Sequence, residues 1–148
     1  MRVRSGFTII ELLSVLALAS VIIATTLPRM SRNLAQVRLQ RAATAVSADM
    51  RLAHSLAERQ RAPVTITIDT AAKIFRVRDT RTPSIIYSER RLDRTSEYPL
   101  QRLSVDRTSL VVYPNGLASS ELNITMTAAG RARLVRMTRA GQVRISVP

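Results

Sequence analysis

Residues 7–27 form an apolar run of 21 residues that contains a single charged residue, Glu11. A helix of about 20 apolar residues crosses the ~30 Å hydrocarbon layer of a bilayer, so this run predicts a transmembrane helix. A charged side chain in such a helix costs about 2.5–3.5 kcal/mol on insertion scales, which makes it a functional hypothesis by default. Glu11 is therefore the first candidate functional residue of the chain.

A cleaved secretory signal is the competing interpretation of the same run. Arg2 and Arg4 would be its basic n-region, and residues 17–19, Ala-Leu-Ala, would be its small-residue cleavage site. Two observations favour the transmembrane helix instead. Glu11 falls inside the apolar part of the supposed signal, and the apolar run continues well beyond residue 19 to Leu27.

The sequence around Glu11 resembles a known processing site. Residues 1–6 end in Gly6 and are followed by Phe7-Thr8-Ile9-Ile10-Glu11-Leu12-Leu13. This is similar to the processing site of type IV pilins and type II secretion pseudopilins, which usually have Leu at the position of Ile9. The resemblance implies that a prepilin peptidase removes residues 1–6 as a leader, cleaves between Gly6 and Phe7, and methylates the new N-terminus of Phe7. Glu11 would be the acidic assembly residue of the family.

Charge pairing gives the same role to Glu11. Cleavage would create a cationic amine on Phe7, and the amine of a neighbouring subunit in a filament could neutralise the carboxylate in one stacking register. The alternative is that Glu11 lies at the membrane interface near a helix N-terminus, where the macrodipole favours negative charge. The complete processing motif favours the assembly role.

The orientation of the predicted membrane helix depends on the same motif. Arginines lie on both sides of the run, and those that follow it, Arg29, Arg32, Arg38 and Arg41, outnumber the two that precede it. The positive-inside rule alone would place the C-terminal side in the cytoplasm. The resemblance to the prepilin processing site implies a cytoplasmic leader and a head delivered outward, so we predict a single-pass inner-membrane protein with a cytoplasmic N-terminus and a periplasmic head. Arg29 and Arg32 would then lie close to anionic lipid headgroups.

Residues 28–62 predict an amphipathic periplasmic helix. Pro28 cannot donate a helical hydrogen bond and predicts a kink or local unwinding. Two neighbouring apolar stripes follow with helical spacing. One contains Leu34, Val37, Ala45, Ala48, Leu52 and Leu56, and the other contains Leu39, Val46, Met50 and Ala57. Such a helix can bury one stripe in its own domain and offer the other to neighbouring subunits.

Residues 63–148 predict a β-rich head, because beyond Pro63 the apolar period changes to two. Strand candidates are residues 64–68, 74–77, 85–87, 110–113, 122–126, 133–137 and 143–147, separated by Gly-, Pro- and Asp-containing turns. Residues 90–101 show neither period and predict a surface loop. The predicted fold class is α+β, with a long N-terminal helix, transmembrane in its first half, packed on an antiparallel sheet. This corresponds to the type IV pilin-like fold that the resemblance implies.

Three further segments resemble the GspH/FimT group: residues 50–69, residues 112–116 (Val-Tyr-Pro-Asn-Gly) and residues 138–144. This narrower resemblance implies an H-type minor pseudopilin of the type II secretion system. Such a subunit lies at or near the tip of the periplasmic pseudopilus that drives export of folded proteins. Its partners would be other minor and major pseudopilins, the prepilin peptidase, the inner-membrane assembly platform and membrane lipid. The alternative is a FimT-like minor pilin of a type IV pilus.

An enzymatic function finds little support. The chain has one His, no Cys and no glycine-rich phosphate loop, so we predict no catalytic residues, no cofactor and no metal site. His54 is expected to be a solvated or partly packed helix residue.

The arginine excess is the one feature that could support another function. The chain has 23 Lys and Arg against ten Asp and Glu, and no acidic residue follows Glu121. Residues 130–133, Gly-Arg-Ala-Arg, resemble a Gly-Arg-x-Arg pattern of DNA-binding pilins in the FimT branch. Arg131 and Arg133 would share one strand face, the next strand would bring Arg144 nearby, and Arg136 completes the candidate DNA site. The alternative explanation is a high-GC genome that encodes Arg in place of Lys.

Overall fold

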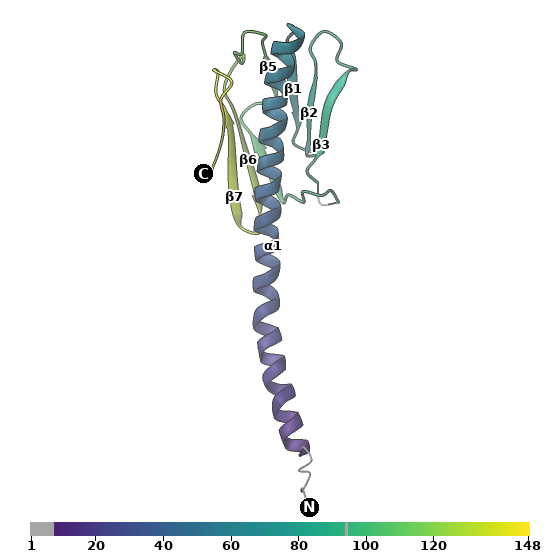
Figure 1. The fold of residues 1–148 in the computed structure, drawn as a ribbon, viewed down its shortest axis with the longest axis vertical. Helices are drawn as coiled ribbons and strands as arrows, with labels where there is room; N and C mark the ends of the chain where they lie inside the picture. The colour runs from purple at the N-terminus through teal and green to yellow at the C-terminus, as the bar shows by residue number, and fades with distance from the viewer. Residues whose placement is uncertain (1–7, 94) are drawn as a thin grey trace, which may run out of the picture. The chain divides into compact units, whose positions relative to one another are not determined.

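The computed structural model describes residues 8–93 and 95–148, and for residues 25–32 it describes the backbone without the side chains. Within these residues the chain forms one long helix followed by eight strands (Figure 1). The elements are α1 (Ile9–Gln60), β1 (Val64–Asp69), β2 (Ile74–Asp79), β3 (Ile86–Arg91), β4 (Arg102–Val105), β5 (Ser109–Val112), β6 (Leu122–Ala128), β7 (Arg131–Met137) and β8 (Val143–Ser146). The chain divides into two compact units, Met1–Leu34 and Ala35–Pro148.

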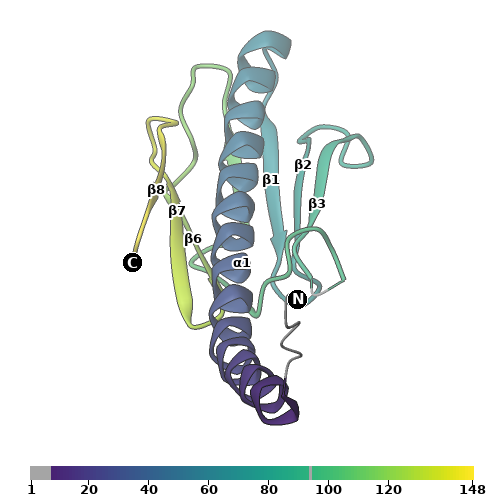
Figure 2. The same cartoon turned by 60° about the horizontal axis from the view of Figure 1, so that its bottom comes forward.

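The strands of the second unit form two four-stranded antiparallel sheets. Their strand orders are β3-β2-β1-β5 and β4-β6-β7-β8. Two contacts connect the strand β5 to the segment that leads into β6. One is a bridge between Val112 and Ala118, and the other is a hydrogen bond from the Ser119 amide to the Val111 carbonyl (2.8 Å). Figure 2 shows the part of α1 that belongs to this unit crossing in front of both sheets, with β1 to β3 on one side and β6 to β8 on the other. The predicted α+β class with an antiparallel head is confirmed.

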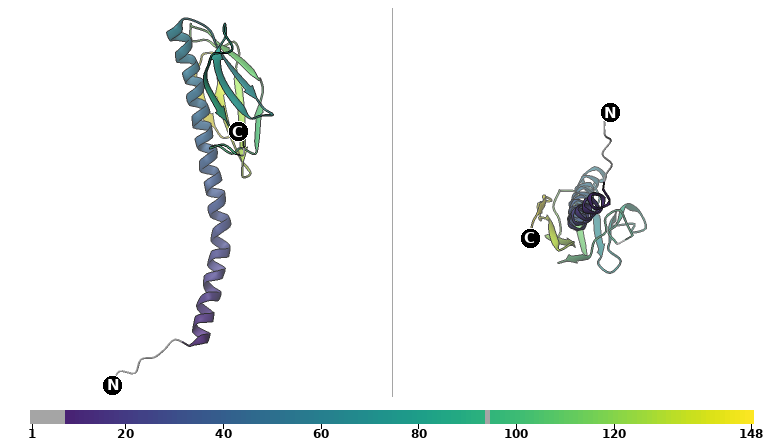
Figure 3. Two further views of the ribbon diagram at one scale, coloured as in Figure 1. Left: turned by 90° about the vertical axis from the view of Figure 1, so that its right-hand side faces the viewer. Right: turned by 90° about the horizontal axis from the view of Figure 1, so that it is seen from below.

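One of the two predicted apolar stripes of α1 is buried against the sheets. The left view of Figure 3 shows the strands along one face of the helix. The buried apolar residues of α1 are Leu39, Ala42, Ala43, Val46, Met50, Ala53 and Ala57, and they join the core made by residues such as Ile66, Phe75 and Val135. Four of these seven are alanines, which let the helix backbone come close to the strands. The other stripe stays exposed at Val37 (49%) and Leu52 (38%), while Leu56 packs partly against the core.

The expectation of a surface loop at residues 90–101 is wrong in part. Arg90 and Arg91 belong to β3, and Leu92 and Leu100 are each only 1% exposed. The Leu92 amide donates to the Lys73 carbonyl (2.9 Å), and the Leu100 amide donates to the Leu92 carbonyl (3.2 Å). Two isolated leucines therefore anchor a segment that has no periodicity of its own. The short strand β4 follows directly and was not predicted.

Two predictions concern the first half of α1. The helix α1 continues across Pro28, and the kink predicted there stays a prediction. Over the described part of the chain, no helix combines the length and the apolar character that a membrane crossing requires.

Candidate functional site

The first turn of α1 carries the candidate assembly residue. Thr8 precedes the helix, and the Glu11 amide donates to the Thr8 carbonyl (3.1 Å) and to the Thr8 hydroxyl (3.3 Å). Thr8 is therefore the N-cap, and the carboxylate of Glu11 lies in the turn where the helix macrodipole favours it. The Thr-x-x-Glu spacing of a capping box is the signal by which sequence reasoning could have found Thr8. Gly6 and Phe7 lie outside the described residues.

Apolar side chains surround Glu11 on all sides of the helix. The exposed large apolar residues of this segment are Ile9, Ile10, Leu12, Leu13, Val15, Leu16, Leu18, Val21, Ile22 and Ile23. Glu11 is the only charged residue between Ile9 and Ala24. A helix that is apolar all round is buried in its functional environment, which is either a bilayer or a bundle of other helices.

The four arginines of the candidate DNA site divide between the two faces of their sheet. Arg131 and Arg133 share the face of Val135 and Met137, which are buried. The Arg133 Nε donates to the Gln40 Oε1 of α1 (2.8 Å), so this face is the one toward the helix.

Arg136 and Arg144 are direct cross-strand partners on the opposite face. Arg136 Nε donates to Asn123 Oδ1 (2.9 Å) and lies 3.1 Å from Glu121 Oε1. The expectation that Arg144 would join Arg131 and Arg133 is therefore wrong. Met137 pairs with Val143, and this register places Arg144 opposite Arg136. Arg144 therefore lies on the face of the sheet away from Arg131 and Arg133.

A buried ion pair that the sequence did not reveal ties α1 to β3. Asp49 is 5% exposed, its Oδ2 accepts from Arg90 Nε (2.5 Å), and its Oδ1 accepts from the Ser88 hydroxyl (3.1 Å). The hydrogen bond to Asp49 raises the pKa of Arg90, whose guanidinium also lies 5.5 Å from the centre of the Tyr98 ring. The sequence signal for this ion pair was an Asp that lies between Val46 and Met50 on the buried stripe of α1.

His54 lies at a junction of two turns. A side-chain carbon on Gly116 would come within 3.0 Å of His54 Cε1, and one on Gly141 would come within 3.1 Å of His54 Nε2. His54 is half-buried, its Nε2 lies 3.8 Å from Glu58 Oε1, and its buried Nδ1 has no hydrogen-bond partner among the described residues. The three segments that suggested the GspH/FimT group thus meet at one histidine, which is partly packed.

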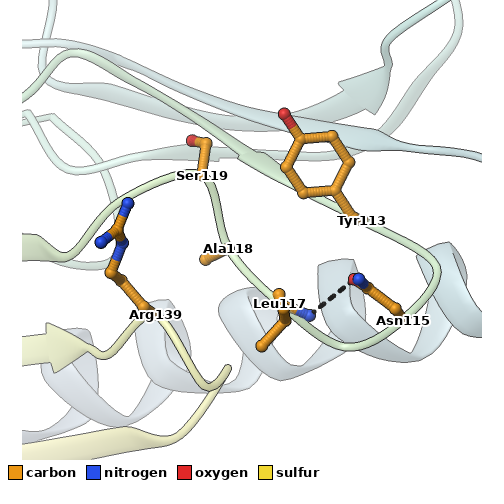
Figure 4. A pocket seen from close by; sticks show the side chains of 6 residues that line it. All are labelled: Tyr113, Asn115, Leu117, Ala118, Ser119 and Arg139. Carbon is orange, nitrogen blue, oxygen red and sulfur yellow. Dashed lines mark hydrogen bonds between the residues drawn. The ribbon is translucent and has the colours of Figure 1, made fainter.

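An open pocket of about 650 Å³ lies beside this junction (Figure 4). Its lining residues are Tyr113, Asn115, Leu117, Ala118, Ser119 and Arg139. The residues that the structure describes contain no cluster of His, Asp and Glu able to hold a metal ion.

A long N-terminal helix packed on antiparallel sheets, with an exposed apolar beginning and a carboxylate in its first turn, defines a type IV pilin-like protein. The family model of the type II transport protein GspH matches residues 42–141, and the chain belongs to this family. The resemblance to H-type pseudopilins seen in the sequence is confirmed. No curated protein matches the chain.

Solved structures agree with this fold. The type IV minor pilin FimU of Pseudomonas aeruginosa aligns with a TM-score of 0.62 at 16% identity, over 75% of this chain and 90% of FimU. The minor pseudopilin EpsH from the type 2 secretion system of Vibrio cholerae aligns with a TM-score of 0.57 at 12% identity, over 75% and 98%. E. coli GspH aligns with a TM-score of 0.50 at 16% identity, over 75% and 89%. At these identities the likeness shows the fold.

Proposed function

We propose that the chain is an H-type minor pseudopilin of a type II secretion system, a structural subunit at or near the tip of the periplasmic pseudopilus that drives export of folded proteins. The observation that carries this proposal is the beginning of α1, where exposed apolar side chains surround the single carboxylate of Glu11. Membership of the GspH family supports the type II assignment. The subunit acts by packing and turns over no substrate.

The proposed assembly mechanism uses both ends of the processing motif. The peptidase cleaves after Gly6 and methylates the amine of Phe7, and the amine of a neighbouring subunit then pairs with Glu11. The Thr8 cap holds the carboxylate in the first turn of the helix. A Gly6→Val chain should keep its leader, and normal processing of that variant in cells would overturn the peptidase assignment.

The second contact with neighbours is the exposed stripe of α1. Val37, Ala48 and Leu52 lie on the side of the helix that the head does not cover. Apolar residues at helical spacing pack against the equivalent surface of another helix. Major and other minor pseudopilins would occupy this surface in the filament.

The proposed location follows from the same mechanism. Residues 7–27 would cross the inner membrane once, with the N-terminus in the cytoplasm and residues 63–148 in the periplasm. The peptidase and the assembly platform would meet the chain at the inner membrane, and the arginines that follow the span would face lipid headgroups.

Export is the measurement that tests this function. A strain that lacks the chain should release less exported enzyme into the medium and accumulate it in the periplasm, and the wild-type chain should restore export. Unchanged export would contradict membership of the secretion system and would favour a pilus. Measuring both compartments in the same samples separates failed export from reduced synthesis.

DNA binding by a FimT-like minor pilin is the second candidate, favoured by one observation. Arg131 and Arg133 follow the turn at Gly130 and line a pocket of about 470 Å³, and neither forms an ion pair within the described residues. Replacing both with Gln in the full-length chain should reduce the slope of log affinity against log salt by about 0.9 for each phosphate that the protein no longer neutralises. The matched control is the double change of Arg136 and Arg144 on the other face. An equal effect of the two variants would assign the binding to net charge.

A further inference from the structure

The loop of residues 113–119 is held in one shape by its own hydrogen bonds. The Tyr113 amide donates to the Leu117 carbonyl (2.8 Å), the Gly116 amide donates to the Tyr113 carbonyl (3.0 Å), and the Leu117 amide donates to Asn115 Oδ1 (3.1 Å). The Ala118 amide donates to the Arg139 carbonyl (2.8 Å), which joins this loop to the turn after β7. The pocket between them is therefore formed before any partner binds.

The same loop exposes large apolar side chains although it is well ordered by these bonds. Tyr113 is 44% exposed and Leu117 is 49% exposed, and both line the pocket. Residues of this kind on a rigid loop bind without a large loss of conformational entropy. Tyr and Arg are also enriched among the residues that dominate the affinity of protein interfaces.

Two polar side chains of the pocket, Arg139 and Ser119, can donate hydrogen bonds to a ligand. Arg139 is exposed and forms no ion pair with any described residue, and Ser119 Oγ accepts from the Val111 amide (3.1 Å), which leaves its hydroxyl hydrogen free to donate into the pocket. Figure 4 shows Arg139 and Ser119 toward one end of the view and Asn115 toward the other, with Leu117 between them. A guanidinium beside a hydroxyl matches a carboxylate, which accepts charge-assisted hydrogen bonds from both.

We propose that this pocket is a docking site for an extended protein segment in which a carboxylate side chain neighbours an apolar side chain. The carboxylate binds Arg139 and Ser119, and the apolar side chain packs on Leu117 and the Tyr113 ring. Charge complementarity selects this occupant, because Arg139 is exposed and forms no ion pair with the acidic residues that the structure describes. None of the pocket residues belongs to the first turn of α1 or to its exposed stripe, so the pocket holds a partner by a different contact from the one proposed for filament packing.

Peptide titration of the full-length chain tests the proposal. The ¹⁵N-labelled protein in zwitterionic micelles is titrated with acetyl-Ala-Leu-Glu-Ala-amide and, in parallel, with the peptide that has Gln in place of Glu. The acidic peptide should shift the amide signals of Leu117, Ser119 and Arg139 at millimolar concentration. The Gln peptide should bind about tenfold more weakly, because it lacks the charge-assisted bond.

Two variants separate the pocket from general electrostatics. Arg139→Gln should abolish the preference for the acidic peptide, whereas Arg131→Gln, which removes the same charge outside the pocket, should keep it. Leu117→Ser should weaken both peptides. The proposal is overturned if neither peptide binds at millimolar concentration, if the two peptides bind equally well, or if Arg131→Gln has the same effect as Arg139→Gln. The spectra also report whether each variant is folded.

Discussion

Asp49 of α1 and Arg90 of β3 are 41 residues apart in the chain and form the ion pair that joins the helix to the outer edge of its sheet, with 2.5 Å between Oδ2 and Nε. The Asp49 side chain is 7% exposed and the Arg90 side chain is 26% exposed. A second bond, from Arg90 Nη2 to Asp49 Oδ1 (3.1 Å), gives the pair two-point geometry. A third donor, the Ser88 hydroxyl, leaves the carboxylate well satisfied inside the fold.

Removing this carboxylate should destabilise the head strongly. Asp49→Ala leaves the Arg90 guanidinium partly buried without a partner, and we expect the free energy of unfolding to fall by about 3 kcal/mol. Urea denaturation of the full-length chain in mild detergent measures the change. The control is Glu89→Gln on the same strand, whose ion pair with Arg76 (2.7 Å) is about one-third exposed and should contribute at most about 1 kcal/mol. Equal losses in the two variants would contradict a special role for the buried pair.

Asp79 should make the stability of the head depend on acid pH. Its pKa is lowered below the ordinary 3.8 because its carboxylate accepts the Thr82 amide, the Tyr87 hydroxyl and the Arg81 amide. A lowered pKa in the folded state gives a contribution that is fully present above about pH 3.8 and is lost as the pH falls through the folded value. Asp79→Asn should therefore flatten the loss of stability between pH 5 and pH 2.

The measurement is the urea midpoint of the wild-type and variant chains across that pH range. Tyr87→Phe removes one of the three donors, since the Tyr87 hydroxyl lies 3.0 Å from Asp79 Oδ2, and should give an intermediate slope. If the urea midpoint of Asp79→Asn falls with acid pH as steeply as that of the wild type, the acid sensitivity belongs to other carboxylates.

Gly141 should tolerate substitution much less than Gly130, although both have a positive φ, +75° and +73°. A side-chain carbon on Gly130 would meet nothing within 4 Å, so Gly130→Ala should lower the free energy of unfolding by about 1 kcal/mol through backbone strain alone. On Gly141 it would lie 2.7 Å from the Gly116 carbonyl oxygen, a backbone atom that cannot move freely. Gly141→Ala should therefore cost at least about 3 kcal/mol. Similar thermal midpoints for the two variants would show that the junction at His54 is not tightly packed.

The fold was predictable where burial leaves a period in the sequence. Residues 64–68 alternate because β1 has a core face, and the two stripes of α1 repeat at helical spacing. Which stripe is buried was not predictable, because both are apolar and only the shape of the sheets decides between them. The strand β4 was missed because it has only four residues, so the alternation of Leu103 and Val105 is too short to stand out.

The site was less predictable, because its geometry depends on pairings between distant segments. The position of Arg144 follows from the length of the turn before β8, and the Asp49–Arg90 contact joins residues that no local pattern relates. Glu11 could be found because a charge in an apolar run is conspicuous in any context. The Thr8 cap could also have been found, since its spacing to Glu11 is local.

Glu11 supplies the prediction that bears most directly on assembly. Glu11→Gln keeps the shape of the side chain and removes its charge, so the variant should be processed and reach the membrane as the wild type does. In the filament, the amine of the neighbouring subunit would lack its partner, and we expect recovery of the variant in a pull-down of the filament to fall at least tenfold, on the order of the effect of leaving a buried charge unpaired. Ser14→Ala is the matched control, because the Ser14 hydroxyl bonds only the Ile10 carbonyl of its own helix (2.8 Å) among the described contacts. Recovery is measured relative to the amount in the membrane fraction, and equal recovery of the two variants would remove Glu11 from the assembly mechanism.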